Sequence, residues 1–435
     1  MGAGEHPRSA AGRGRVGRWR PRGRVGGGDR WGGFTMTVAT VAALVWANWP
    51  GTRSYFSTWL SVAPWSSPVG LHLTVRDWVN EALMLAFFAL IGLEIRREFT
   101  AGELRSARRA LVPVVAALVG MAVPAVIYTA VVAGGVGARG WGIPMATDVA
   151  FALGALALIG GTTLRVRVFL MTLAVADDIA SIVVLVVFYS HDTRLAWLAG
   201  GLGALGALTV VWIARVRAGW LRVVLGAAAW WAMLHAGVEA AVIGVALGAF
   251  LPARRPARSE LRATPAGSAA RATSAGSAVR ATSAGSAVRA KPSAASPTVR
   301  AWVHRLEPVV NMAVLPVFAL ANTGLSFAGS GLGSGASLRV FAAVVAARLI
   351  GKPLGITVAT LVTMHVNPDV YQPPIVTRSL VGVGAVASIG FTVPLLIIQT
   401  ALPVGPLATA ATAGLLAGSV LGAGAGLIVL RGGAS

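Results

Sequence analysis

The stretch VRVFLMTLAVADDIASIVVLVVFYS, residues 166–190, is long enough to cross a lipid bilayer, yet it contains two adjacent carboxylates, Asp177 and Asp178. A helix needs about 20 apolar residues to span the hydrocarbon core. A charge at the bilayer centre costs at least ~2.5 kcal/mol on insertion scales, and intramembrane ionisable residues usually mark a functional site. We therefore predict that this pair binds something positive, with protons and small cations as the first candidates.

The composition of the whole chain is that of a membrane protein. Of its 435 residues, 56% are hydrophobic and 12% are charged, whereas ~25% are charged in a typical soluble protein. Apolar runs near the length of a membrane helix recur along the chain, and the alternating segments of about 10 residues that mark a β-barrel do not occur. The sequence therefore predicts an all-α polytopic membrane protein. The absence of cysteine excludes disulfides and thiolate sites.

About twelve transmembrane helices are predicted, eight before and four after a long polar insertion. The predicted spans are 34–49, 74–96, 110–133, 144–160, 167–189, 195–213, 220–235, 236–252, 308–327, 340–363, 379–400 and 407–430. The net charge of +22 would suggest nucleic-acid binding in a soluble protein, but most Lys and Arg lie between or beside these spans. Their excess on one side predicts cytoplasmic N- and C-termini, and no nucleic-acid partner is expected.

Two polar regions lie outside the helical units 34–252 and 308–430. Residues 1–33 are interpreted as a disordered basic cytoplasmic arm, and residues 253–307 as a flexible cytoplasmic linker. The linker repeats RATPAGSAA, RATSAGSAV and RATSAGSAV from Arg262, without the large apolar residues that would form a core. Both regions are expected to lack a specific role, and binding to anionic lipid headgroups is the alternative.

Two apolar segments are interrupted by polar and helix-breaking residues. They read WGIPMATDVAFALGALALIGG at 141–161 and GVGAVASIGFTVP at 382–394. Irregular backbone at membrane depth occurs where it lines a cavity or is buried in protein, and paired breaks in two halves of a chain indicate a transporter site. If the two segments cross, Asp148 would offset their positive helix ends and Lys352 their negative ends.

Lys352 is also the natural partner for one carboxylate of the aspartate pair, because buried charges persist when they are paired. Neighbouring residues on a helix point about 100° apart, so Asp177 and Asp178 cannot both face this lysine. One carboxylate is therefore expected to pair with Lys352, while the other binds a cation. An intramembrane aspartyl protease is not favoured, because it needs its two aspartates on separate helices.

Several stretches resemble the NhaA-type sodium/proton antiporters, over roughly residues 32–252 and 308–430. The matching motifs are FFALIGLEIRREFTAGEL, GWGIPMATDVAFALGALALIG, LAVADDIASIVVLVVFYS, PVFALANTGLSF, RLIGKPLGI and SIGFTVPLL. The resemblance implies inverted repeats, with two interrupted helices crossing near the membrane midplane. It implies that Asp178 is the principal Na⁺ ligand, that Asp177 pairs with Lys352, and that Thr147 and Asp148 are the polar residues at the crossing.

A cytoplasmic funnel that senses pH is a further implication of the resemblance. Its expected members in this sequence are Glu94, Arg97, Glu98 and His304. Here the chain departs from the family: Glu239 stands where a histidine is common, and WVHRLEPVV at 302–310 retains only His304 of an acid-and-histidine cluster.

The resemblance predicts a transporter and not an enzyme. It would be an electrogenic antiporter of a bacterial plasma membrane, exporting Na⁺ or Li⁺ in exchange for external H⁺ by alternating access. The two ions would compete for Asp177 and Asp178, no cofactor is expected, and a homodimer is compatible with the resemblance. The alternatives are an exchanger that prefers another monovalent cation such as K⁺, or a proton-coupled symporter.

Overall fold

The protein is helical throughout the part of the chain that the structure describes. This computed structural model describes residues 27–51, 53–66, 72–159, 164–190, 194–214, 216, 218–239, 241–250, 297–327, 333–368 and 376–431. Within these ranges a single β-bridge joins Val62 and Thr74, and seven helices are long and apolar enough to cross a membrane. The predicted all-α polytopic architecture agrees with these observations.

The described helices fall into two groups, before and after residues 251–296. The first half of the chain forms α1 (Gly27–Ala47), α2 (Ser54–Leu60), α3 (Val75–Trp78), η2 (Val79–Leu83), α4 (Met84–Ala101), η3 (Glu103–Arg105), α5 (Ala107–Val132), η4 (Ala138–Gly142), α6 (Val149–Ile159), α7 (Leu164–Tyr189), α8 (Leu195–Ile213), α9 (Gly219–Ala236) and α10 (Ala241–Phe250). The second half forms α11 (Pro297–Val309), η6 (Val310–Val314), α12 (Leu315–Asn322), α13 (Gly335–Ala346), η7 (Ala347–Gly351), α14 (Lys352–Val366), α15 (Thr377–Val386), α16 (Thr392–Ala401) and α17 (Pro406–Arg431).

Two helices begin earlier than the sequence predicted. α1 starts at Gly27, so residues 27–33 of the predicted disordered arm are helical. Gly32 lies against Asn311, so this part of α1 packs on another helix. α11 starts inside the predicted linker, because Val299 and Val303, one turn apart, turn one face of the helix into the core. Residues 1–26 of the arm and the nine-residue repeats lie outside the described residues.

Three long helical spans contain a π-helical turn. η2 joins α3 to α4, η6 joins α11 to α12, and η7 joins α13 to α14. Such turns insert an extra residue into a helix and occur often at functional sites. Each of the three carries a polar residue into the protein interior: Asn80 in η2, Asn311 in η6 and Arg348 in η7 are all buried.

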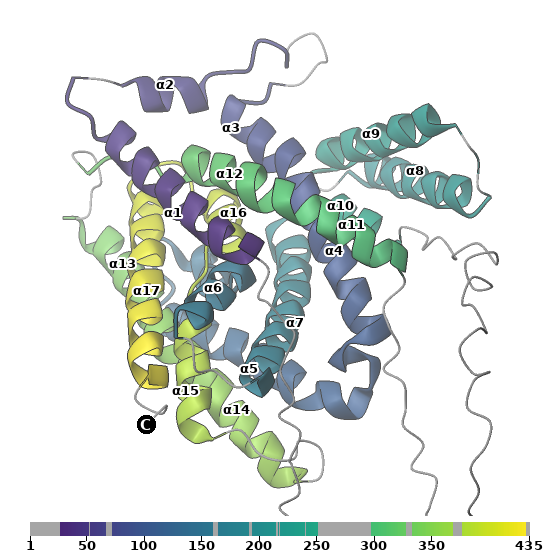
Figure 1. Cartoon of the computed structure of the whole chain (residues 1–435). Coiled ribbons are helices and arrows are strands. Elements are labelled where there is room, and N and C mark those ends of the chain that lie inside the picture. Colours follow the sequence, from purple (N-terminus) through teal and green to yellow (C-terminus); the bar gives the residue numbers. More distant parts are fainter. Residues whose placement is uncertain are drawn as a thin grey trace, which may run out of the picture.

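α7 passes through two hydrophobic clusters and carries the aspartate pair between them. Its first half packs with α5, α6, α14 and α15 through side chains such as Phe169 and Leu173. Its second half packs into the larger cluster that includes α1, α4, α12 and α16, through side chains such as Leu185. Figure 1 shows α7 near the middle of the bundle, and α8 and α9 paired at its edge. Packing therefore holds Asp177 and Asp178 deep inside the bundle.

The contact between α4 and α10 depends on small residues. Gly244 and Gly248 lie one turn apart on α10, and an added Cβ at Gly248 would lie 2.7 Å from the backbone nitrogen of Leu93 and closer still to the carbonyl oxygen of Ala89. Small residues at this spacing allow two membrane helices to approach closely. The pair fixes α4, which lines the site described below.

We expect Gly248→Ala to destabilise the folded protein by about 1–3 kcal/mol, because overpacking forces the two backbones apart. The measurement is the thermal midpoint of the purified protein in detergent. Gly203→Ala on α8 is the control, because an added Cβ at Gly203 meets nothing within 4 Å. Equal midpoints for the two variants would contradict close packing between α4 and α10.

Candidate functional site

Asp177 forms a buried ion pair with Lys352, the first residue of α14. The Lys352 Nζ donates to the two carboxylate oxygens at 3.0 and 3.1 Å, and both residues are fully buried. The same Nζ donates to the Thr147 hydroxyl at 2.9 Å, and the Thr147 backbone N–H donates to Asp177 at 2.7 Å. The carboxylate is therefore held by charge and by a backbone donor, and the predicted pairing of Asp177 with Lys352 is present.

Asp178 differs from its neighbour although it is equally deep in the bundle. Its exposed fraction is 6%, and within the described ranges its carboxylate makes no hydrogen bond or ion pair. It lines a cavity of about 200 Å³. Removing a carboxylate from water without a compensating partner is costly. A cation or a proton that neutralises Asp178 therefore lowers its free energy, which is the chemistry of an exchange site.

Asp148 lies between the N-termini of two helices. Its Oδ1 accepts from the backbone N–H of Phe151 at 3.4 Å in the first turn of α6. Its Oδ2 accepts from the hydroxyl of Thr392, the first residue of α16, at 3.3 Å. Its own N–H donates to the carbonyl of Ile389, between α15 and α16, at 2.9 Å. The carboxylate thus offsets the partial positive charge of both helix ends, at the position expected from the sequence.

The carbonyl groups at the breaks meet a different base from the one predicted. Arg348 is fully buried, and its guanidinium donates to the carbonyls of Ser388 at 2.8 Å and Ala146 at 3.1 Å. A longer bond of 3.4 Å reaches the carbonyl of Ile143. Within the described ranges the hydrogen bonds of Lys352 go to Asp177 and Thr147 and not to these carbonyls, so its predicted role in offsetting the negative helix ends stays a prediction. Arg348 bridges the two segments, because its planar fork of donors serves several acceptors at once.

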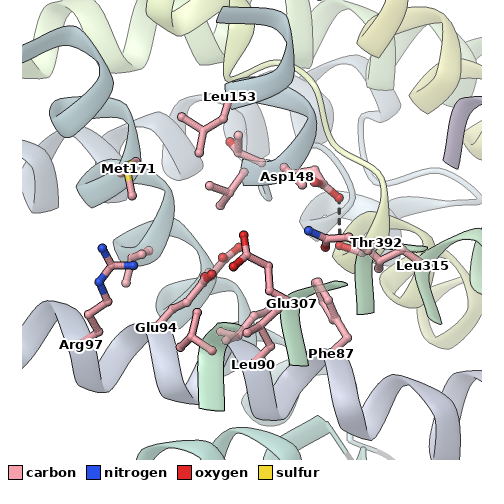
Figure 2. A pocket seen from close by; sticks show the side chains of 18 of the residues that line it. Phe87, Leu90, Glu94, Arg97, Asp148, Leu153, Met171, Glu307, Leu315 and Thr392 are labelled. Atoms are coloured by element: carbon pink, nitrogen blue, oxygen red, sulfur yellow. Dashed lines mark hydrogen bonds between the residues drawn. The ribbon is translucent and has the colours of Figure 1, made fainter. Parts of the chain in front are cut away.

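The cavity beside Asp178 reaches the protein surface along α4. Glu94, Arg97 and Glu98 line it together with Asp148, and Arg97 is exposed. Figure 2 shows Arg97 and Asp148 on opposite sides of this cavity, with Glu94 and Glu307 between them. A charged corridor thus leads from the surface to the buried carboxylate.

His304 is not among the residues that line this corridor. Its side chain is exposed, whereas Val303 and Glu307 on the same helix line the cavity. Val303 and Glu307 are one turn apart and share a face of α11, while His304 points about 100° away from Val303. The predicted role of His304 in sensing pH stays a prediction, and Glu307, which the resemblance places at a neighbouring sensor position, is the acidic residue of α11 that lines the cavity.

Comparison with known proteins connects this geometry to a group of transporters. Residues 27–430 match the model of a family described as Na+/H+ antiporter 1. The chain is 37% identical over 409 residues to the Na(+)/H(+) antiporter NhaA 1 of Myxococcus xanthus, covering 92% of this chain and 90% of that protein. It is 38% identical over 412 residues to NhaA 3 of Frankia alni, with 92% and 86% covered. It is 35% identical over 415 residues to NhaA 2 of Novosphingobium aromaticivorans, with 94% and 96% covered.

Proposed function

The chain belongs to the Na+/H+ antiporter 1 family, and we propose that it exports Na⁺ or Li⁺ across a bacterial plasma membrane in electrogenic exchange for external protons. The observation that carries this proposal is the contrast between two adjacent carboxylates. Asp177 is neutralised by Lys352, while Asp178 faces a cavity without a protein partner in the described part of the chain. A single unpaired carboxylate at the end of an aqueous corridor suits an ion that binds and leaves.

The mechanism proposed is competition between the two ions for the aspartate pair. Na⁺ and Li⁺ are hard cations that favour oxygen ligands. Asp178 supplies a carboxylate, and Asp148 and Thr392 line the same cavity and supply further oxygens. A carboxylate that has taken a proton is a poor ligand for Na⁺, so a proton arriving from outside displaces the ion. Na⁺ arriving from the cytoplasm expels the proton in the same way.

Alternating access would follow from the two interrupted segments. η4 and α6 form one of them, α15 and α16 the other, and hydrogen bonds from Thr147 and Asp148 to the carbonyls of Ala387 and Ile389 join their breaks. We place this crossing near the membrane midplane, where broken helices hold substrates in transporters of this kind. Rocking of one bundle against the other would then open Asp178 to each side in turn.

In this arrangement the cytoplasmic entrance is the end of α4 that carries Glu94, Arg97 and Glu98. The acidic side chains there attract cations to the entrance, and we propose that this cluster senses pH. Both chain termini would lie in the cytoplasm, with the basic arm and linker near anionic lipid. A homodimer is compatible with this arrangement.

Proton movement in proteoliposomes, driven in turn by Na⁺, Li⁺ and K⁺ gradients, tests the proposal. We expect Na⁺ and Li⁺ to exchange and K⁺ not to, because the smaller ions fit a site built from carboxylates. An imposed membrane potential should change the rate if the exchange is electrogenic. Preference for K⁺ would favour the alternative exchanger, and cation movement in the same direction as protons would favour a symporter.

A further inference from the structure

Three amide side chains meet on the side of Asp178 that lies away from the charged corridor. They are Asn80 in η2, Asn322 at the end of α12 and Gln399 near the end of α16. The Asn322 amide donates to the Asn80 oxygen at 2.8 Å, and both Asn80 and Gln399 donate to the Asn322 oxygen. Asn80 also donates to the Gln399 oxygen. We call this group the amide cluster.

The amide cluster stands on the same helices that form the cavity of Asp178. Each amide lies about two helical turns, or ~10 Å, from a side chain that lines that cavity. The corresponding lining residues are Phe87, Leu315 and Thr392. Asn80 lies near the start of the long span Val75–Ala101 and Arg97 near its end, so the cluster and Arg97 lie toward opposite ends of this span. The cluster therefore lies beyond this cavity, on the side opposite to its entrance, and none of its three amides is among the lining residues.

A second cavity begins where the amide cluster ends. It measures about 270 Å³, and Asn322 and Gln399 are among its lining residues, together with Arg76 and Thr412. Its rim includes Val404, which is 77% exposed, so this cavity opens on the other face of the protein. The amide cluster thus lies between two cavities that open toward opposite ends of the same helices.

We propose that the amide cluster is a second, transient cation-binding site, which a partly dehydrated Na⁺ or Li⁺ crosses between Asp178 and the outer cavity. The inference rests on the proposed function. Amide oxygens are suitable ligands for hard cations. An ion that passes through the cluster takes the place of the N–H groups that now donate to these oxygens. Because the cluster carries no charge, it binds the ion weakly, as conduction requires. When the three amides bond to one another, the cluster blocks the path between Asp178 and the outer cavity and acts as the outer gate.

The first test replaces one amide by an apolar side chain of similar size, Gln399→Leu. We expect the maximal rate of Na⁺/H⁺ exchange in vesicles to fall about tenfold or more. Na⁺-induced proton release from the purified protein in detergent should not change, because it reports the site at Asp178. Thr400→Val is the matched control, since within the described part of the chain the hydrogen bonds of the Thr400 hydroxyl go to carbonyls of its own helix. An unchanged rate of exchange would overturn the proposal. A lower thermal midpoint in the same variant would then identify the cluster as a structural contact.

The second test uses the absence of cysteine from the chain. Asn322→Cys combined with Gln399→Cys provides a thiol pair at the cluster, without any other thiol to react. The reduced variant should exchange slowly, because it lacks two of the three amides. Oxidation should stop this remaining exchange and a reductant should restore it to the same low rate, while proton release continues. Undiminished exchange in fully cross-linked protein would overturn the proposal. Absence of Na⁺-induced proton release from the unaltered protein would instead count against the proposed function itself.

Discussion

Asp178→Asn is expected to reduce Na⁺-dependent proton exchange to the background of vesicles that lack the protein. Asparagine keeps the size of the side chain, but it neither takes up a proton nor offers a charged ligand. Because Asp177 is engaged by Lys352, no adjacent carboxylate replaces the lost one. The measurement is the collapse of an imposed pH gradient in everted vesicles on addition of Na⁺ or Li⁺. Purified Asp178→Asn protein should also release no protons when Na⁺ is added.

Asp77→Asn provides the matched control for this experiment. Asp77 is the acidic residue of a capping box with Thr74, at the start of α3, and does not line the cavity of Asp178. The same chemical change there should leave exchange near its normal rate, with at most a modest loss of stability from the weakened helix cap. Exchange by Asp178→Asn at the unaltered rate would remove Asp178 from the transport site.

The chemistry of the site was predictable where it follows from residue type alone. Two carboxylates and one lysine in apolar segments must find partners, because an unpaired buried charge is costly. This argument predicts that one of the two carboxylates pairs with Lys352, and only the resemblance to the antiporters implies that this carboxylate is Asp177. It also predicts breaks in the helices around Asp148 and Gly390, because proline, glycine and polar residues interrupt these segments. The structure has non-helical residues between α15 and α16 and before α6.

What the sequence did not predict depends on which helix face meets which neighbour. Arg348 and Lys352 are one turn apart, and spacing alone does not tell which of them reaches the broken segments. The π-helical turn η7 contains Arg348 and ends directly before Lys352, and it changes the direction of these side chains relative to a regular α-helix. Only packing therefore decides which of the two reaches the broken segments. His304 and Glu307 present the same difficulty on α11. The amide cluster has no sequence signal at all, because Asn80, Asn322 and Gln399 come together only in the folded protein.

Lys352→Met should destabilise the protein strongly, by about 3–5 kcal/mol, because it leaves Asp177 buried without its partner. Methionine retains most of the apolar stem of the lysine, so lost packing contributes little. The thermal midpoint in detergent should therefore fall well below that of the unaltered protein. Arg348 does not compensate, since its donors are taken up by backbone carbonyls of the two breaks.

The double variant Lys352→Met with Asp177→Asn separates charge from packing. A neutral asparagine still accepts the backbone N–H of Thr147, which bonds to Asp177 in the unaltered protein at 2.7 Å, and no buried charge is left unpaired. Replacing both members of a buried ion pair is often neutral, while removing one is not. We therefore expect most of the lost stability to return. A double variant as unstable as Lys352→Met would mean that lysine acts through packing and its bond to Thr147, and that the ion pair itself contributes little.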